Sequence, residues 1–324
     1  MRRGRGLAAA AFILLAAVCS APSSAKAQPR EVKLGVYVTA LNGINLGAGT
    51  FNADLWLWST TASDELRPLE SVDIVNASSR YSELTGTRHA DSAHWYQQRV
   101  RVTARNEFHI HHFPFDSQKL HLSFEDSLLA AKDLVYIADR ENSRVAGAVR
   151  IPGWTVRGWD IKVVEHRYDT SFGDPGHSGP VVASRLIFTV DIQRDGLAEF
   201  IELSLGALVA FAILALTFRM NPTLPPIFAG RMGVIVASVF TVTISLRGAN
   251  AATALPIGST LVDRIHLVTL AAGFAAAVAA ATVRYMAESG RESRALAVDR
   301  RAMPIFIGAY IAIVTATLVP ALVD

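Results

Sequence analysis

Two hydrophobic patterns divide this chain of 324 residues near position 196. Before that point, apolar residues alternate with polar ones in short runs, which is the spacing of half-buried β-strands. Turn-forming pairs such as Asn42-Gly43 and Pro152-Gly153 separate the runs. Residues 28–196 are therefore predicted to form an all-β, immunoglobulin-like antiparallel sandwich of roughly eight to ten strands. The alternating faces behind this prediction are Val32, Leu34, Val36 and Val38; Phe51, Ala53, Leu55 and Leu57; and Leu186, Phe188, Val190 and Ile192.

After position 196 the alternation gives way to four apolar runs, each long enough to cross a bilayer as a helix. Residues 197–324 are predicted to form an α-helical transmembrane domain with helices at about 200–218, 231–250, 260–286 and 303–323. Basic residues gather near Arg219 and Arg231, and again between Arg284 and Arg301. Because basic loops stay in the cytoplasm, we expect the sandwich and the carboxyl end at Asp324 to be periplasmic.

Residues 1–27 have the pattern of a secretory signal peptide. The basic start, the short apolar core and the small-residue cleavage site are Arg2–Arg5, Leu7–Val18 and Ala25–Ala27, which leaves Gln28 as the first mature residue. Cys19 is the only cysteine and precedes that site, so the mature chain would hold no disulfide and no thiolate nucleophile. Together with the four spans, the signal predicts a multi-pass protein of the bacterial inner membrane.

The composition agrees with a membrane protein, because 51% of residues are hydrophobic and only 18% are charged. The net charge of +3 is mostly loop arginine and does not suggest a nucleic-acid partner. His109, His111 and His112 have no carboxylate or cysteine at ligand spacing, so solvated or protonatable histidines are favoured over a metal site. No nucleophile–base pair and no glycine-rich phosphate loop stands out, so neither an enzyme nor a cofactor is predicted.

The second apolar run differs from the other three because it carries hydroxyls and ends near Arg247. Ser238, Thr241 and Ser245 have the spacing i, i+3 and i+7, which forms one continuous stripe on a helix. Intramembrane polar groups usually face a cavity, so the stripe is interpreted as a wetted pore lining. Hydroxyls can also bond the backbone locally, and packing between helices is the alternative interpretation.

Residues Phe113–Gln118, with the sequence Phe-Pro-Phe-Asp-Ser-Gln, lie midway between the signal and the membrane domain. The segment resembles the signature loop of pentameric ligand-gated ion channels of the Cys-loop receptor superfamily, in the bacterial form without the loop cysteines. The resemblance covers nearly all of residues 31–322 and includes further matches in the right order. These are Gly158-Trp159-Asp160, Arg194, the segment from Ala229-Gly230-Arg231 to Ser238–Thr243, Leu255-Pro256 and Thr260–Asp263.

The resemblance implies a homopentamer, surrounded by membrane lipids, that opens a pore for inorganic ions when it binds a small molecule or a proton. It places ligand-binding residues on the hairpin Arg167–Ala183, at Tyr168 and Phe172, with Trp56 or Trp58 across the subunit boundary. For the two tryptophans, packing within the sandwich is the alternative. Coupling to the pore is expected from the signature loop, Arg194 and the linker to the third helix, which means Phe113, Pro114, Phe115, Asp116, Arg194, Pro256 and Asp263.

If the register of the family's pore helix is taken from Arg231, the resemblance implies a pore-facing stripe that differs from the hydroxyl stripe. In this register a ring of Phe240 forms a hydrophobic constriction that closes by dewetting. The hydroxyls then face neighbouring helices, whereas the alternative register turns Ser238, Thr241 and Ser245 toward water. The favoured register consists of Gly233, Ala237, Phe240, Ile244 and Arg247.

Ala229, Gly230 and Arg231 occupy the position of the selectivity ring in this resemblance. Rings of arginine favour anions, so copies of Arg231 and Arg247 predict anion permeation. Glu199 and Glu202 at the start of the first helix are acidic and would favour cations instead. Two rival functions remain: a non-conducting periplasmic receptor of the same fold, and a membrane-anchored metal-dependent enzyme built on the histidine cluster.

Overall fold

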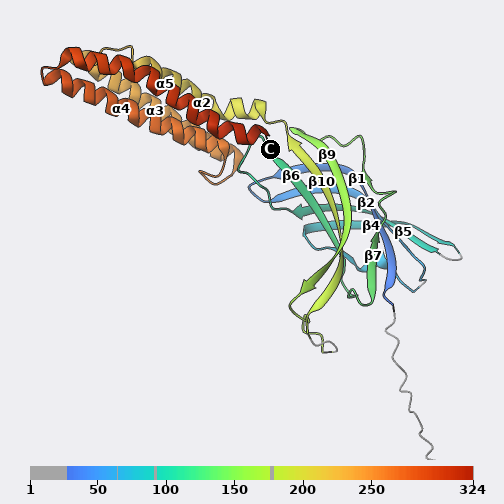
Figure 1. Cartoon of the computed structure of the whole chain (residues 1–324). Coiled ribbons are helices and arrows are strands. Elements are labelled where there is room, and N and C mark those ends of the chain that lie inside the picture. Colours follow the sequence, from blue (N-terminus) through green and yellow to red (C-terminus); the bar gives the residue numbers. More distant parts are fainter. Residues whose placement is uncertain (1–27, 64, 91–92, 176–178, 324) are drawn as a thin grey trace, which may run out of the picture.

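The computed structural model describes residues 28–63, 65–90, 93–175 and 179–323 and places two layers of β-sheet at one end of a helix bundle (Figure 1). The predicted signal peptide 1–27, including its cleavage site and Cys19, lies outside the described residues. The predicted combination of a sheet-rich amino-terminal half and four apolar helices is confirmed.

The larger sheet has six strands among the described residues, in the order β4-β5-β2-β1-β7, with β8 also pairing with β1. The pairs β4–β5, β5–β2 and β2–β1 are antiparallel, as predicted, whereas β7 and β8 run parallel to β1. The parallel pairs arise because the chain crosses from the smaller sheet to reach the edge of the larger one. The strands are β1 (Arg30–Asn45), β2 (Thr50–Thr61), β4 (Ala77–Ala90), β5 (Ala93–Arg105), β7 (Leu134–Ala138) and β8 (Arg144–Val145).

The smaller sheet has four strands among the described residues, in the order β3-β6-β10-β9, and all its pairs are antiparallel. A single turn of helix, α1 (Pro68–Ser71), precedes its edge strand. Its strands are β3 (Val72–Ile74), β6 (Ser117–Asp126), β9 (Trp154–Tyr168) and β10 (Val181–Arg194).

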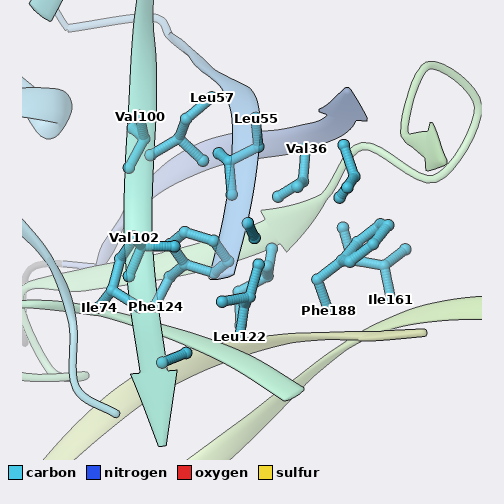
Figure 2. Close-up of a cluster of buried hydrophobic side chains, with 14 of the residues drawn as sticks. Val36, Leu55, Leu57, Ile74, Val100, Val102, Leu122, Phe124, Ile161 and Phe188 are labelled. Carbon is cyan, nitrogen blue, oxygen red and sulfur yellow. The ribbon is translucent and has the colours of Figure 1, made fainter. Parts of the chain in front are cut away.

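The core of the sandwich lies between the two sheets, where the predicted alternating faces meet. Figure 2 shows Val36, Leu55 and Leu57 of the larger sheet with Leu122 and Phe188 of the smaller one, and all five are buried. All twelve residues of the three predicted faces are buried, so this part of the prediction is confirmed. Each large apolar side chain that leaves water contributes ~1.5–3 kcal/mol to the stability of the fold. Apolar residues at every second position therefore determine which face of a strand is buried.

Four helices follow the sandwich, and each is long and apolar enough to cross a membrane. The last helix was expected to begin near residue 303 but begins at Glu292 and runs through Pro304. Its added turns are amphipathic, because Ala295 and Asp299 are buried while Arg294, Val298 and Arg300 beside them are exposed. The helix then returns to the sandwich end of the bundle (Figure 1). The helices are α2 (Leu197–Thr217), α3 (Pro225–Thr253), α4 (Leu261–Glu288) and α5 (Glu292–Val323).

Candidate functional site

A buried ion pair joins the Phe113–Gln118 turn to the end of β10. Nε of Arg194 donates to Oδ1 of Asp116 at 2.8 Å, and the side chains are 10% and 2% exposed. Nε2 of Gln118 donates to Oδ2 of Asp116 at 2.6 Å, so both carboxylate oxygens are hydrogen-bonded. Sequence reasoning placed both charges near the domain boundary, and the structure brings them into contact.

Arg194 also reaches across the boundary into the helix bundle. Its Nη1 lies 3.2 Å from Oε2 of Glu199 in the first turn of α2. The guanidinium carbon lies 4.1 Å from the ring centroid of Trp154 and 4.8 Å from that of Phe113. Desolvated contacts of this kind strengthen the attraction between the cation and the ring faces. One arginine therefore connects β9, β10, α2 and the Phe113–Gln118 turn, which is called the signature turn below.

The same turn packs directly on the helices. A Cβ on Gly196, just before α2, would lie 1.8 Å from the Pro114 carbonyl oxygen, so only glycine permits this approach. The rings of Phe115 and Phe200 pack at a centroid distance of 5.4 Å. Phe113 belongs to a buried cluster that contains residues of α3, α4 and their linker, namely Ala249, Leu255 and Val262.

The linker between α3 and α4 is braced by its own hydrogen bonds. Oδ2 of Asp263 accepts from the backbone N–H groups of Gly258 and Thr260, each at 3.1 Å, and Thr260 Oγ1 accepts from the Asp263 N–H. This is a capping box, and it fixes the start of α4. The carbonyl of Pro256 accepts from Ser259. Asp263 and Pro256 thus shape the linker, while the adjacent Leu255 makes the contact with the signature turn.

All five residues of the favoured stripe on α3 are exposed in the described chain. Phe240 and Ile244 are 64% and 68% exposed, and Gly233, Ala237 and Arg247 are exposed as well. Ser238 of the rival stripe is 3% exposed and donates to the Val234 carbonyl, and Thr241 donates to the Ala237 carbonyl.

The third hydroxyl of the rival stripe is used within the bundle. Oγ of Ser245 lies 2.9 Å from Nε2 of the buried His266 on α4. Hydroxyls that bond the preceding turn or a neighbouring helix need no water. Within the chain, the packing interpretation therefore accounts for Ser238 and Ser245, whereas Thr241 is exposed and bonds only to its own helix.

Arg231 differs from the expectation of a positive ring. Its side chain is fully buried inside the bundle, where Nη1 lies 2.9 Å from Oδ1 of Asp299 on α5. Ala229 and Gly230, its predicted companions, are exposed. A carboxylate distant in the sequence holds Arg231 on the face of α3 opposite the exposed stripe, and the role of Ala229, Gly230 and Arg231 as a selectivity ring stays a prediction. Among the basic residues that supported anion permeation, Arg247 alone lies on that stripe.

Tyr168 and Phe172 line a groove at the β9–β10 hairpin. The groove has a volume of about 480 Å³ and is bordered on its other side by the segment Glu125–Asp133. The two rings pack edge to face at 5.1 Å. The Tyr168 hydroxyl donates to Oε2 of Glu125 at 2.8 Å, and Arg185 pairs with the same carboxylate. Burial and the bond to Glu125 raise the pKa of the Tyr168 phenol, so it stays neutral at physiological pH.

The two tryptophans lie on the other sheet, away from this groove. The guanidinium of Arg99 lies 5.8 Å from the ring of Trp56. The indole of Trp58 covers Gly35, where a Cβ would come within 2.2 Å of the ring, and its N–H donates to Asp139 at 2.9 Å. Within one subunit Trp58 is therefore a packing residue. A role for either tryptophan across a subunit boundary stays a prediction.

Replacing Trp58 with Phe is expected to destabilise the sandwich by about 1.5–3 kcal/mol at neutral pH, the usual contribution of a hydrogen bond to a charged group. Burial raises the pKa of Asp139, but bonds from Trp58, Lys33 and Asn142 outweigh it and lower the pKa below its ordinary value. A lowered pKa gives stability that is present above the unfolded pKa and is lost as pH falls through the folded pKa. The deficit should therefore shrink below about pH 4.

Denaturant unfolding of wild type and Trp58→Phe at neutral and acidic pH measures this difference. Trp56→Phe is the matched control, because its ring contact with Arg99 is a surface interaction of the same sheet. An equal loss for both variants at all pH values would contradict the role of the Asp139 bond.

The histidine cluster does not form a ligand set in the described part of the chain. Nowhere among those residues do three or more His, Cys, Asp or Glu side chains meet at a spacing suited to a metal ion. His109 is joined to Gln118 through its backbone N–H and carbonyl, so its main contact is structural.

Sequence reasoning missed Trp154 and Gly196 at the junction and Asp299 beside Arg231. A glycine directly before an apolar run, as at Gly196, indicates a place where another segment approaches the backbone closely. No local sequence pattern marks Trp154 or Asp299 as part of a contact. Comparison with known proteins adds no identification: no model of a protein family matches the chain, and no curated protein matches it at a significant level.

Proposed function

We propose that this chain is one subunit of a homopentameric ligand-gated ion channel of the bacterial inner membrane. The observation that carries the proposal is the Asp116–Arg194–Glu199 connection, in which a buried Asp116–Arg194 pair in the sandwich also contacts the partly exposed Glu199 of α2. A binding domain that merely had to be anchored would need no such junction, because a flexible linker would suffice.

In this proposal the sandwich is immunoglobulin-like and periplasmic, and it receives the ligand at the β9–β10 groove. Tyr168 and Phe172 offer aromatic faces, and Asp126, Asp133 and Glu125 lie along the same groove. Aromatic faces beside carboxylates suit an organic cation. A tryptophan of the neighbouring subunit closes the groove from the other side.

Ligand binding favours one of two packings of the outer domains, and it shifts gating only by its differential affinity for them. The signature turn and Arg194 pass the change to α2 and to the α3–α4 linker. Five copies of α3 then tilt around a pore lined by the exposed stripe. In the resting state the Phe240 ring keeps water out. Arg247 on this stripe supports anion permeation, which is opposed by Glu202, exposed on α2.

Purified protein is expected to be a pentamer and to conduct after reconstitution. One α3 helix per subunit cannot enclose water, so a pore requires several copies. Native mass spectrometry in detergent measures the assembly, and bilayer recordings across a pH series and a panel of small amines measure gating. A reversal potential under a chloride gradient with impermeant cations reports the permeant charge.

A stable monomer or dimer as the main species would reject the pore. A pentamer that binds ligand without carrying current would instead favour the non-conducting receptor of the same fold.

A further inference from the structure

Two histidines face each other across the end of the β4–β5 hairpin. His89 of β4 is the direct antiparallel partner of His94 of β5. Residues that are directly opposite hold their Cβ atoms about 4.5–5.5 Å apart, which brings the two side chains into contact. The ring centroids lie 5.0 Å apart, and the two Nδ1 atoms are 2.8 Å apart. The two rings therefore converge on the space between their Nδ1 atoms.

The surroundings of the pair stiffen this part of the hairpin. The ring of His89 meets the ring of Tyr96 edge to face at 5.9 Å. Tyr96 is buried, and its hydroxyl accepts a hydrogen bond from Nη1 of Arg67 at 2.8 Å. Neighbouring residues of a strand point to opposite faces, and on the other face the guanidinium of Arg88 lies 5.8 Å from the ring of Trp95. Contacts on both faces thus support the strands that carry the pair.

The pair is open to solvent in the described chain. His89 is exposed and His94 is half-buried. The hairpin that carries them extends to the end of the sandwich that lies away from the helix bundle (Figure 1). A small ion from the solution therefore has access to both Nδ1 atoms without any rearrangement of the core.

The short distance between the rings requires something positive between the two nitrogens. A neutral imidazole has one N–H donor and one acceptor nitrogen, so one Nδ1 donates to the other and the pair shares a proton. A metal ion can take the place of that proton when both rings carry their own protons on Nε2. Both Nδ1 lone pairs are then free for coordination, which is a common role of neutral histidine.

The separation of the nitrogens is close to that of two ligands on one ion. Zinc–nitrogen bonds of about 2.0–2.1 Å at a tetrahedral angle place two nitrogens about 3.3–3.4 Å apart. The Nδ1 atoms, now 2.8 Å apart, would move apart by about half an ångström, which small side-chain rotations provide.

The ligand type selects the class of metal. Imidazole suits zinc, copper and nickel, whereas magnesium and calcium prefer oxygen ligands. Within the described ranges no third His, Cys, Asp or Glu side chain completes a ligand set, so water molecules would occupy the remaining positions.

We propose that His89 and His94 form a binding site for a divalent transition metal of the zinc class, one ion per subunit, at the end of the β4–β5 hairpin. The bound ion bridges the two strands and holds this end of the hairpin closed. The inference goes beyond the proposed channel function and does not depend on it, because both ligands come from one hairpin of one chain.

Calorimetric titration of the purified full-length protein with zinc chloride, in the absence of a polyhistidine tag, tests the site. Wild type is expected to bind one Zn²⁺ per subunit and to bind Mg²⁺ far more weakly. His89→Gln and His94→Gln should each weaken zinc binding by about 100-fold, because the second ring of a preformed pair acts as an intramolecular ligand. A wild type that binds no Zn²⁺ would overturn the inference, and so would wild-type affinity in the two variants.

His111→Gln is the matched control, because His111 is an exposed histidine outside this hairpin. This variant should keep the wild-type affinity for zinc. Loss of binding in His111→Gln would assign the metal to other ligands and reject the pair. The two single variants of the pair are independent of each other, so either one decides the result if the other does not fold.

Hydrogen exchange measured by mass spectrometry locates the bound ion. Zinc should slow amide exchange in peptides from the adjoining ends of β4 and β5 in wild type but not in His89→Gln, since a ligand stabilises the closed form that it binds. Slower exchange elsewhere in the chain, with none at the hairpin, would overturn the inference. No readout requires a current, so a protein that binds zinc at the hairpin without conducting would reject the channel and leave the metal site in place.

Discussion

Arg194→Gln is expected to remove most of the agonist-evoked current while agonist affinity and pentamer assembly stay close to wild type. The substitution takes away the only cation that touches both Asp116 and Glu199 in the described structure. Asp116 would remain buried with Gln118 as its donor, and removing one partner of a buried pair costs about 3–5 kcal/mol. Ligand binding at the distant hairpin groove would continue, but its consequence would not reach α2.

Arg140→Gln is the matched control for this prediction. Arg140 pairs with Asp160 at 2.7 Å on the surface of the same sandwich, and both side chains are about half exposed or more. Surface pairs contribute about 0–1 kcal/mol, so this variant should gate normally. Agonist affinity from equilibrium binding and current from bilayer recordings must be measured together. Loss of both in a correctly assembled Arg194→Gln would assign Arg194 to ligand binding and reject coupling.

Asp116→Asn provides the complementary variant. It leaves the Arg194 guanidinium between Trp154 and Phe113 with Glu199 as its remaining counter-charge. Because the amide still accepts one hydrogen bond, folding should suffer less than in Arg194→Gln. If the pair carries the coupling, the double variant should lose no more current than either single variant. If the current of the double variant is instead reduced by the product of the two single losses, Asp116 and Arg194 have separate roles.

The sequence predicts the elements better than their contacts. The period of two along β1, β2 and β10 identifies the buried faces, because one sheet face must leave water whatever the other strands do. The four apolar helices follow from the length and apolar composition of the runs. The contact between Asp116 and Arg194 depends on the antiparallel register of β6 and β10. In this register Ser117 pairs with Gln193, so Asp116 and Arg194, one position beyond that pair, lie opposite each other. That register is a tertiary property.

The partner of Arg231 and the true start of α5 escaped prediction from the sequence for one reason. Asp299 lies 68 positions after Arg231, in a charged segment that local rules predict as a loop. Only when that segment forms a helix are Ala295 and Asp299 buried on one face, with Asp299 in contact with Arg231 of α3. A sequence pattern thus reveals the positive charge in the first turns of α3 but not the carboxylate that pairs with it.

Phe240→Ala is expected to leave folding unchanged and to raise the resting conductance by about an order of magnitude. The Phe240 side chain is 64% exposed in the subunit, so its removal opens no cavity in the bundle. In a narrow pore, an apolar ring excludes water without blocking the path physically, and smaller side chains widen and re-wet it. Ile244, one turn away on the same stripe, would then be the next constriction.

Phe274→Ala is the matched control, because Phe274 is 65% exposed on α4 and loses the same ring from a surface outside the predicted pore. Leak current without agonist, normalised to the amount of reconstituted pentamer, is the measurement. Thr241→Val tests the competing register on the same helix, since Thr241 belongs to the hydroxyl stripe and donates to the Ala237 carbonyl. A leak from Phe240→Ala alone places the exposed stripe in the pore. If Phe240→Ala closes as tightly as wild type while Thr241→Val alters gating, the hydroxyls face the water and the favoured register is rejected.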